Sequence, residues 1–482
     1  MCGLIGVSGT TDAARDALVG LMNLQHRGQD GAGILTLVEN NSGLFNLQKG
    51  SGLVENVFSE RAFKNLKGRL AIGHTRYATI GRKDPNLLQP FLDAASGLAI
   101  GHNGNIVNVY ALRDELLQDK VEYHPATGSD SEVILKLLSR EVADRKLNAE
   151  TLFSAVSVAM HKLVGSYAVV GLDGQGGLFG FRDPDGIRPL VLGKRLNSDT
   201  GATIYALASE SVALSYQGYA IEDEIGPGEA IYIDAAGNVT RKVLFKRSDS
   251  ACMFESVYFS RVESEHLTQS IYEIRFALGL ELAELIKSLN LTFDVVVPVP
   301  ETSRSAAIAI AESLNLPFRE SLIKNRYVNR TFILDGHDAR QEAIRRKLSP
   351  IASEIRGKRC LVIDDSIVRG TTAAQIIELM RQCGAKEVTM ASTCPQIKNP
   401  CYYGIDFPSQ NELVAYDSTD QQIAQKLGAD RVIFQTLEGL RKALKQESLC
   451  TGCLTGTYPT DISCADDFQV QRLKDRTLTS KS

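Results

Sequence analysis

The sequence predicts two domains of different fold class, an α+β sandwich followed by an α/β domain with a parallel sheet. The chain has 482 residues, and single hydrophobic cores stop growing at roughly 250 to 300 residues. The first 245 or so residues are dense in short β-like runs separated by Gly, Asn and Asp turns. From about residue 270 the pattern becomes helix, apolar strand, helix, which is typical of a parallel sheet.

In the first half the apolar runs are short, and a few amphipathic helical stretches interrupt them. Helices that pack on the outer faces of stacked sheets would bury both kinds of element. Strands are expected at Cys2–Ser8, Ala71–His74, Leu98–Gly101, Ala168–Leu172, Gly177–Arg182 and Glu229–Ile233, and helices at Asp12–Leu24 and Ser131–Leu138.

In the second half strands and helices alternate. Strands are expected at Asp294–Val299, Cys360–Asp365 and Glu387–Ser392, and helices at Arg304–Leu314 and Thr372–Cys383. The segment Asn325–Lys347 is crowded with charge and weakly periodic, which predicts a long mobile loop of the kind that serves as a lid. The predicted domains are residues 2–245 and 246–466, followed by a polar tail at 467–482.

Composition narrows the function. Hydrophobic residues make up 44% and charged residues 23% of the chain, its net charge is −4, and it has no long run of Lys or Arg. No nucleic-acid or anionic membrane partner is therefore expected. The apolar runs are far shorter than the roughly 20 residues that cross a bilayer. The N-terminus lacks the features of a signal peptide, so a cytoplasmic protein, or an organellar one that is already processed, is predicted.

The cysteines point to thiol or metal chemistry. Nine cysteines, an odd number, are spread along the chain, which is unlike a secreted disulfide framework. Removal of Met1 would give Cys2 a free α-amine, whose reference pKa of roughly 7.7 to 8.0 suits it to accept the thiol proton. Cys2 would then carry both a nucleophile and its base. The alternative is a small apolar residue at the start of a buried strand.

Four further blocks occur with Cys2-Gly3. They are Leu24–Gly33, Gly73–Thr79, Gly101–Asn108 and Gly128–Glu132. Together they resemble the signature blocks of class II glutamine amidotransferases, in the family's order. The resemblance implies an N-terminal-nucleophile fold with αββα layers and a cysteine nucleophile at Cys2.

The same blocks supply residues suited to amide hydrolysis. The Asn103 side-chain amide and the Gly104 backbone N–H can stabilise a tetrahedral oxyanion. Arg76 and Asp130 can bind the α-carboxylate and α-amine of glutamine, and Thr79 belongs to the same predicted glutamine site. Taken alone, Asn103-Gly104 would instead predict a hairpin turn, and Arg76 and Asp130 would be solvated surface charges.

The run Cys360–Thr372 has the pattern of a phosphate cradle. An apolar strand ends in two carboxylates, and a loop with hydroxyls and a glycine leads into a helix, where anions are favoured. It resembles the phosphoribosylpyrophosphate motif of type I phosphoribosyltransferases. The resemblance implies that Asp364 and Asp365 bond the ribose hydroxyls. It also implies a 5′-phosphate loop made of Ser366, Arg369, Gly370, Thr371 and Thr372. The alternative is an acidic strand end followed by a threonine helix cap.

A second phosphate-facing loop is expected at Val297–Arg304, which resembles the family's pyrophosphate loop. Lys324, Arg326 and Arg330 could close over the diphosphate, or they could be solvated charges of a basic loop. Mg²⁺ is expected, carried mainly by the substrate phosphates near Asp364 and Asp365.

The two halves together resemble the glutamine phosphoribosylpyrophosphate amidotransferase family over nearly all of the chain. Further matching blocks are Arg182–Leu190, Ala208–Ser211, Pro227–Glu229 and Leu322–Val328; Val262 departs from the family's usual Pro. The resemblance implies a pentosyltransferase that uses glutamine and phosphoribosylpyrophosphate to make phosphoribosylamine, glutamate and pyrophosphate, the first committed step of purine synthesis. It also implies inhibition by AMP, GMP or ADP, and a homodimer or homotetramer.

Cys450 and Cys453 form a CxxC pair, a metal or redox signal that cannot close a site alone. One branch of the family carries a [4Fe–4S] cluster, and the resemblance implies Cys252 and Cys401 as the other two ligands. Zinc is the alternative metal, because four cysteines suit it equally. Cys360 and Cys383 are expected to be small hydrophobic residues; Cys394 and Cys464 have no predicted role.

Two other functions compete with this one. A catalytically silent relative could bind phosphoribosylpyrophosphate or nucleotides as a regulatory module, although the intact Cys2, Asn103, Asp130 and paired acids argue against it. Another class II amidotransferase, such as glucosamine phosphate synthase, would need a sugar-isomerase half, which the phosphoribosyl motif excludes.

Overall fold

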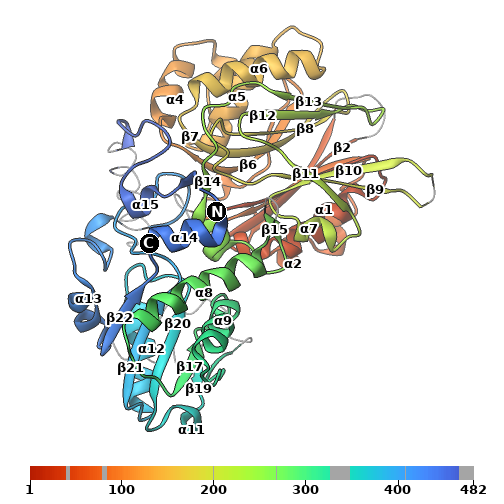
Figure 1. Cartoon of the computed structure of the whole chain (residues 1–482). Coiled ribbons are helices and arrows are strands. Elements are labelled where there is room, and N and C mark those ends of the chain that lie inside the picture. Colours follow the sequence, from red (N-terminus) through yellow and green to blue (C-terminus); the bar gives the residue numbers. More distant parts are fainter. Residues whose placement is uncertain are drawn as a thin grey trace.

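The computed structural model describes residues 1–38, 44–78, 84–198, 200–266, 269–325, 348–407, 409–465 and 470. The first half is a sandwich of two antiparallel sheets, and the second half is built around a parallel sheet (Figure 1). The segment predicted to be a mobile loop, Asn325–Lys347, lies outside the described residues except for Asn325, and so does the tail at 467–482 except for Val470.

One sheet of the sandwich has seven strands and the other has six. In spatial order the first contains β11 (Ala220–Glu224), β9 (Val191–Leu196), β10 (Thr203–Ala208), β1 (Gly3–Ser8), β4 (Leu70–Arg76), β2 (Gly31–Leu37) and β3 (Phe45–Ser51). The second contains β13 (Val239–Val243), β12 (Glu229–Ile233), β8 (Leu178–Arg182), β7 (Gly165–Asp173), β6 (Leu98–Ile106) and β5 (Phe91–Asp93).

Helices cover the outer face of each sheet. The seven-stranded sheet is covered by α1 (Ala13–Asn23), α2 (Val54–Val57) and α7 (Val212–Ser215), and the six-stranded sheet by α4 (Val109–Leu117), α5 (Asp130–Val142) and α6 (Ala149–Lys162) (Figure 1). Strand β1 shows the layering, because Leu4 packs between the sheets whereas Ile5 and Val7 pack against α1. Side chains of a strand alternate between its two faces, and here both faces are buried. The αββα prediction is confirmed.

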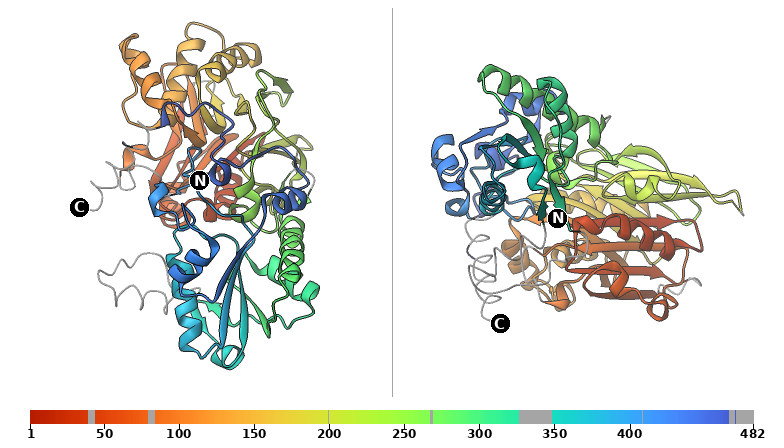
Figure 2. Two further views of the ribbon diagram at one scale, coloured as in Figure 1. Left: turned by 60° about the vertical axis from the view of Figure 1, so that its left-hand side comes forward. Right: turned by 90° about the horizontal axis from the view of Figure 1, so that it is seen from below.

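The second half carries its parallel sheet in the order β17 (Val295–Pro298), β20 (Arg359–Asp364), β21 (Glu387–Ser392) and β22 (Arg431–Phe434). The helices α8 (Ile271–Ser288) and α9 (Arg304–Leu314) cover one face, and α12 (Thr371–Gln382) and α13 (Asp420–Leu427) cover the other. Both faces are thus apolar, as parallel sheets require. Figure 2 shows this sheet apart from the sandwich.

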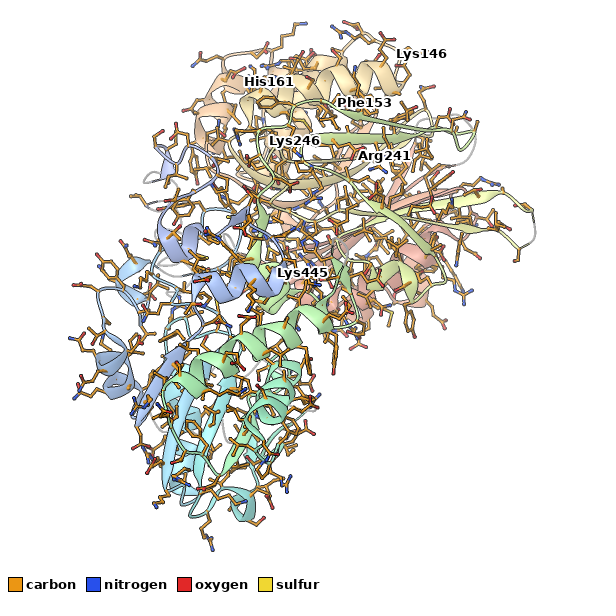
Figure 3. All side chains as sticks on the ribbon, in the orientation of Figure 1. Lys146, Phe153, His161, Arg241, Lys246 and Lys445 are labelled. Carbon is orange, nitrogen blue, oxygen red and sulfur yellow. The ribbon has the colours of Figure 1, made fainter. Side chains whose placement is uncertain are left out.

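The chain packs against the sandwich just before it continues into the second half. The ring of His161, near the end of α6, stacks on Phe245 with 4.3 Å between ring centroids. Figure 3 labels His161 and Phe153 on that helix; Phe153 is buried against the six-stranded sheet. The chain stays bonded to the sandwich beyond Phe245, because the backbone N–H groups of Arg247 and Ser250 donate to Pro184 O and Asp185 O at 2.9 and 2.7 Å.

The junction of the halves has its own core. Strand β14 (Ala251–Cys252) pairs in parallel with β23 (Leu449–Cys450), and the π-helix η4 (Glu255–Phe259), α14 (Leu437–Leu444) and α15 (Gly452–Thr455) pack beside them. The N-terminus lies at this junction in all views (Figures 1 and 2). Met1 is itself buried in this core together with residues of the second half. The start of the chain is therefore placed between the two halves.

Candidate active sites

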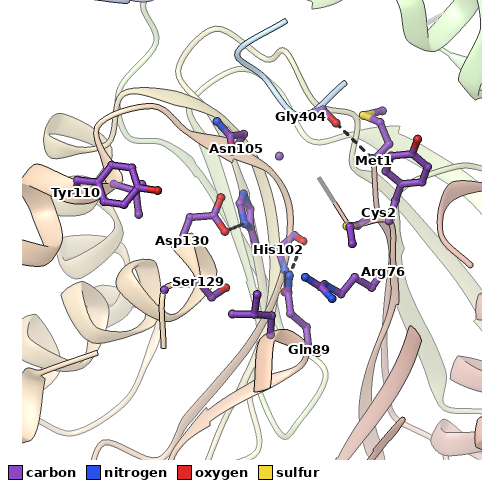
Figure 4. Close-up of a pocket in the computed structure, with 16 residues that line it drawn as sticks. Met1, Cys2, Arg76, Gln89, His102, Asn105, Tyr110, Ser129, Asp130 and Gly404 are labelled. Atoms are coloured by element: carbon purple, nitrogen blue, oxygen red, sulfur yellow. Dashed lines mark hydrogen bonds and ion pairs between the residues drawn. The ribbon is translucent and has the colours of Figure 1, made fainter. Parts of the chain in front are cut away.

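The first candidate site is a cavity that opens beside Cys2 (Figure 4). Cys2 and Arg76 lie on one side of it, and Ser129, Asp130 and Tyr110 lie on the other. Its lining residues are Met1, Cys2, Arg76, Tyr77, Ala78, Leu87, Gln89, His102, Gly104, Asn105, Val109, Tyr110, Gly128, Ser129, Asp130 and Gly404. Four blocks distant in the sequence therefore meet in one cavity.

Asn103 is held against the start of strand β1. The Cys2 backbone N–H donates to Asn103 Oδ1 at 2.9 Å. The side-chain amide nitrogen of Asn103 is buried and has no hydrogen-bond partner. A buried unsatisfied donor is costly in a folded protein, so this nitrogen is available to a ligand that carries negative charge on oxygen.

Asn103-Gly104 does not form a hairpin turn. The two residues lie inside β6 and pair with Ala168 and Tyr167 of β7. Gly104 has φ +154°, and a Cβ there would come within 2.0 Å of the Ser166 carbonyl oxygen, so only glycine fits. The hairpin interpretation is wrong because pairing with β7 overrides the local turn preference.

Arg76 and Asp130 reach the cavity from opposite elements. Arg76 ends β4 and is 7% exposed, so it is not a solvated surface charge. Asp130 begins α5, and its carboxylate accepts hydrogen bonds from the backbone N–H groups of Ser131 at 2.8 Å and Ile106 at 3.3 Å. Burial disfavours the charged carboxylate, but His102 and these hydrogen bonds outweigh it and lower the pKa of Asp130. Asp130 is therefore an anion at neutral pH. Thr79 lies outside the described residues.

His102 and Gly404 are among the residues of this site that were not predicted. His102 Nδ1 lies 3.6 Å from Asp130 Oδ1 and 3.1 Å from Ser131 Oγ, so His102 helps to orient Asp130. Gly404 comes from the second half, and the carbonyl oxygen of Tyr402, two residues before it, accepts from Asn105 Nδ2 at 2.8 Å. His102 lies in a recognised block and could have been found. Gly404 could not, because only tertiary contact brings it here.

Asn103→Ala tests the predicted oxyanion donor. We expect glutamine hydrolysis to lose about 100- to 1,000-fold in kcat, the usual effect of removing one such donor, and ammonia-dependent synthesis to stay within about twofold. Asn108→Ala is the control, because Asn108 also bonds backbone, to Lys162 O and Val164 N, but outside the cavity. An equal loss of glutamine hydrolysis in both variants would contradict the assignment.

The second candidate site lies at the carboxyl end of β20. Asp364 Oδ1 accepts the Asp365 N–H at 2.9 Å, and Asp365 accepts from the hydroxyls of Ser366, at 2.8 Å, and Thr302. Burial raises the pKa of both carboxyls, and the Asp365 charge adds to the effect on Asp364. Thr302 belongs to the loop at Val297–Arg304, so the two predicted phosphate-facing loops meet through this bond.

The loop after these acids leads directly into α12. Gly370 is the N-cap residue with φ +79°, and no side chain caps the helix. Thr371 and Thr372 are exposed, and Arg369 pairs with Glu412 at 3.1 Å. The threonine-cap interpretation is therefore wrong, and the backbone N–H groups of the first turn are open to an anion.

Lys324 is exposed at the end of β18 (Leu322–Lys324), which pairs with β19 (Leu348–Pro350). Arg326 and Arg330 lie outside the described residues.

Comparisons with known proteins name the family. Residues 74–215 match the glutamine amidotransferase domain, and residues 269–407 match the phosphoribosyl transferase domain. The chain is 43% identical to amidophosphoribosyltransferase of Escherichia coli (strain K12), over 93% of this chain and 89% of that protein. It is 39% identical to the amidophosphoribosyltransferase of Saccharomyces cerevisiae, over 99% and 95%. The chain belongs to the amidophosphoribosyltransferase family.

Solved structures agree with this assignment. The B. subtilis glutamine phosphoribosylpyrophosphate amidotransferase complexed with ADP and GMP has a TM-score of 0.85 and 35% identity, and covers 96% of this chain and 98% of its own. The structure described as the allosteric regulatory enzyme of purine biosynthesis has a TM-score of 0.86 and 36% identity, and covers 96% and 97%. This amidophosphoribosyltransferase is a pentosyltransferase that acts at the first step of purine biosynthesis. A sugar-isomerase partner half is excluded by the phosphoribosyl transferase match.

The four cysteines that are predicted to bind a cluster all lie in the core at the junction of the two halves. Cys252 and Cys450 are cross-strand partners on β14 and β23, Cys453 lies in α15, and Cys401 precedes the Tyr402–Gly404 segment. All four are buried free thiols. Burial raises the pKa of Cys252 to about 11. Within the described ranges no group of three or more His, Cys, Asp or Glu side chains is close enough to hold one metal ion.

Proposed function

We propose that this amidophosphoribosyltransferase hydrolyses glutamine at Cys2 and passes the ammonia to phosphoribosylpyrophosphate bound at Asp364 and Asp365. One observation carries the first assignment. The unpartnered amide nitrogen of Asn103 is buried next to Cys2, which lines one cavity together with Arg76 and Asp130. Glutamine offers a complementary set of groups, namely an amide, an α-carboxylate and an α-ammonium.

In the amidase half the Cys2 thiol attacks the amide carbon, and the thiol proton passes to the Cys2 α-amine. The Asn103 side-chain amide and the Gly104 N–H stabilise the oxyanion. As the tetrahedral intermediate collapses, the C–N bond breaks, and the departing nitrogen takes the proton back from the α-ammonium and leaves as ammonia. Water then hydrolyses the thioester to glutamate. Met1 must first be removed, because the Cys2 nitrogen is otherwise part of a peptide bond and cannot accept a proton. Met1 also lines the cavity, and its amino group donates to Gly404 O at 3.3 Å.

In the transferase half Asp364 and Asp365 hold the ribose hydroxyls, and the loop Ser366–Thr372 holds the 5′-phosphate against the start of α12. Ammonia attacks the ribose carbon as pyrophosphate leaves. Mg²⁺, carried mainly by the substrate phosphates near the two acids, would offset the charge that develops on the leaving group. Pyrophosphate release that depends on both glutamine and phosphoribosylpyrophosphate tests the whole assignment, and a catalytically silent relative would release none.

We also propose a [4Fe–4S] cluster on Cys252, Cys401, Cys450 and Cys453. Four buried thiols fit a cationic group that would bind them as thiolates. A single zinc ion would need all four thiolates around one point, and among the described residues no group of three or more such side chains is arranged to hold one metal ion. Each thiolate of a cluster binds a different iron, so the cluster accepts a wider spacing.

Protein purified without oxygen is expected to be brown and to contain about four irons per chain. Replacing Cys453 by serine should lower the iron content, whereas replacing the exposed Cys464 by serine should leave it unchanged. Metal analysis and the visible spectrum measure this. Colourless, active protein with one zinc per chain would decide for zinc.

The remaining proposals concern inhibitors, oligomeric state, domain boundaries and cellular location. AMP, GMP or ADP would inhibit the enzyme; the B. subtilis relative was crystallised with two of these nucleotides. We propose a homodimer or homotetramer, and domain boundaries at residues 245 and 466. Among the described residues no helix combines the length and hydropathy needed to cross a membrane, and we propose a cytoplasmic enzyme.

A further inference from the structure

Sequence blocks without an assigned role converge on one buried group of charges beneath Cys2. The group, called here the junction cluster, consists of Arg27, Arg188, Glu210 and Glu255. All four are 0 to 3% exposed, and none lines the cavity. Two guanidinium groups face two carboxylates, so the formal charges cancel. Such a set is favourable in a protein interior only when its geometry is well satisfied.

Arg27 is the centre of the junction cluster. Its Nη1 donates to Glu210 Oε1 at 2.5 Å, and its Nη2 donates to Glu255 Oε1 and Oε2 at 2.8 and 3.0 Å. The remaining donor, Nε, bonds the Cys2 carbonyl oxygen at 3.0 Å. Because a guanidinium is planar and rigid, two carboxylates that hold its ends also fix the direction of Nε. The Cys2 carbonyl is therefore oriented by Glu210 and Glu255 acting through Arg27.

The two carboxylates come from different halves of the chain. Glu210 follows β10 in the sandwich, whereas Glu255 begins η4, beyond the crossing. Both carboxylate oxygens of Glu255 accept from Arg27, and Oε1 also accepts from Arg188 at 3.2 Å. The transferase half therefore supplies one of the two groups that orient Arg27.

A chain of hydrogen bonds continues from the junction cluster into the transferase half. Glu210 Oε2 accepts from Arg261 N at 2.9 Å and from Ser264 Oγ at 2.8 Å. Arg275 of α8 donates to the carbonyl oxygens of Ser256, Tyr258 and Ser260 at 2.7 to 3.1 Å. The segment 256–264 is therefore held by hydrogen bonds to Arg275 and to Glu210.

Arg275 also lies near the charge of Asp365 in the ribose site. Burial lowers the pKa of Arg275, and the nearby Asp365 charge partly offsets this. Arg188 connects the two halves on the other side of the junction. It donates to Glu255 Oε1 at 3.2 Å and to the Tyr403 carbonyl oxygen. The same carbonyl oxygen also accepts from Ser166 Oγ at 2.9 Å. These polar contacts link Cys2 to elements of both halves of the chain.

We propose that Glu255, acting through Arg27, is a positioning residue of the glutaminase site. The transferase half fixes the Cys2 carbonyl and with it the directions of the thiol and of the α-amine freed by removal of Met1. This inference rests on the proposed role of Cys2. Misplacement of a nucleophile by a fraction of an ångström lowers the rate of attack more than it lowers substrate binding.

Glu255→Gln in the full-length enzyme tests the proposal, because it keeps the shape and removes the charge. The kcat of glutamine-dependent synthesis is expected to fall about 10- to 100-fold, with the KM for glutamine and the ammonia-dependent rate within about twofold. Arg27→Lys keeps the positive charge but loses the planar guanidinium group. It is expected to show the same fall in kcat with glutamine, with the KM for glutamine and the ammonia-dependent rate again nearly unchanged. Glu255→Asp should recover part of the loss.

Asp16→Asn is the matched control. Asp16 pairs with Arg195 at 2.5 Å and accepts from Tyr219 Oη at 2.7 Å in the same sandwich, without contact to Cys2. It is expected to leave both rates unchanged at equal folded yield. Iron content is measured in every variant, since Glu255 lies close to Cys252 in sequence.

Parallel loss of both activities, or an unchanged kcat with glutamine in Glu255→Gln and Arg27→Lys, would overturn the proposal. Failure of Glu255→Gln to fold would leave Arg27→Lys and Glu255→Asp to decide. Cys2→Ala distinguishes the underlying function. If that variant kept glutamine-dependent synthesis, the role of Cys2 would fail; if it lost synthesis while the Glu255 variants did not, only the positioning role would fail.

Discussion

Cys2→Ala is expected to abolish glutamine-dependent synthesis, with a loss of about 10,000-fold or more, as expected for removal of a covalent nucleophile. Synthesis from high concentrations of ammonia should stay within about twofold. The reason is spatial: Cys2 lies in the sandwich cavity, whereas Asp364 and Asp365 lie at the end of β20 in the parallel sheet. Free ammonia bypasses the first site but still needs the second.

Phosphoribosylamine formation from each nitrogen source measures this result. Cys464→Ala is the control, because Cys464 is exposed and lies in neither site. Both rates of this control should equal those of the unmodified enzyme. Loss of the ammonia-dependent rate in Cys2→Ala would contradict the assignment of the two half-reactions to separate sites.

Asp364→Asn is expected to remove synthesis from both nitrogen sources, by about 100-fold or more, because the ribose would no longer be positioned. It should also stabilise the free protein at neutral pH. Burial and the Asp365 charge raise the pKa of Asp364, so its ionised form disfavours folding. Asparagine keeps the oxygen that accepts the Asp365 N–H and carries no charge.

The stabilisation has a defined pH dependence. Below the unfolded pKa of roughly 3.9 the carboxyl is protonated in both states and costs nothing. As pH rises, the carboxyl ionises first in the unfolded state, so the free energy of unfolding falls. The full destabilisation is reached above the raised pKa of the folded state. The midpoint of thermal unfolding of Asp364→Asn should therefore exceed that of the unmodified protein by about 2 °C or more at pH 7.5. The two midpoints should converge near pH 4.

Asp294→Asn is the control of opposite sign. Hydrogen bonds from Arg359 lower the pKa of Asp294 to about 2, so this charge stabilises the fold above the unfolded pKa and its removal should not raise the midpoint. Calorimetry of both variants without substrate distinguishes them. A lower midpoint for Asp364→Asn at neutral pH would contradict the expected strain in the acid pair.

Local patterns predicted several elements well. The helix at Arg304–Leu314 and the strands at Glu229–Ile233 and Glu387–Ser392 were expected with the bounds that the structure has. Each is a short apolar-rich run that Gly, Pro or polar residues end. The helix expected at Thr372–Cys383 begins and ends one residue earlier, since Gly370 rather than a threonine caps it.

Asn103-Gly104 shows where local patterns fail. The pair is the strongest short hairpin signal, yet it lies within β6 because nine residues of that strand pair with β7. The site itself was predicted only through the combination of blocks, since each block alone has a common structural explanation. Chemistry that depends on several short motifs is visible in a sequence when the motifs occur together.

By itself the sequence determined the two fold classes and the family, and it predicts the nucleophile, the oxyanion donors, the ribose acids and the four cluster cysteines, because these depend on residue type, local periodicity and motif order. Only the tertiary structure decided what lies between the motifs. It places Gly404 on the glutamine cavity, Thr302 on Asp365 and Glu255 on Arg27. Each of these contacts joins residues far apart in the chain, and their proximity depends on how the two halves pack, for which a single sequence carries no local signal.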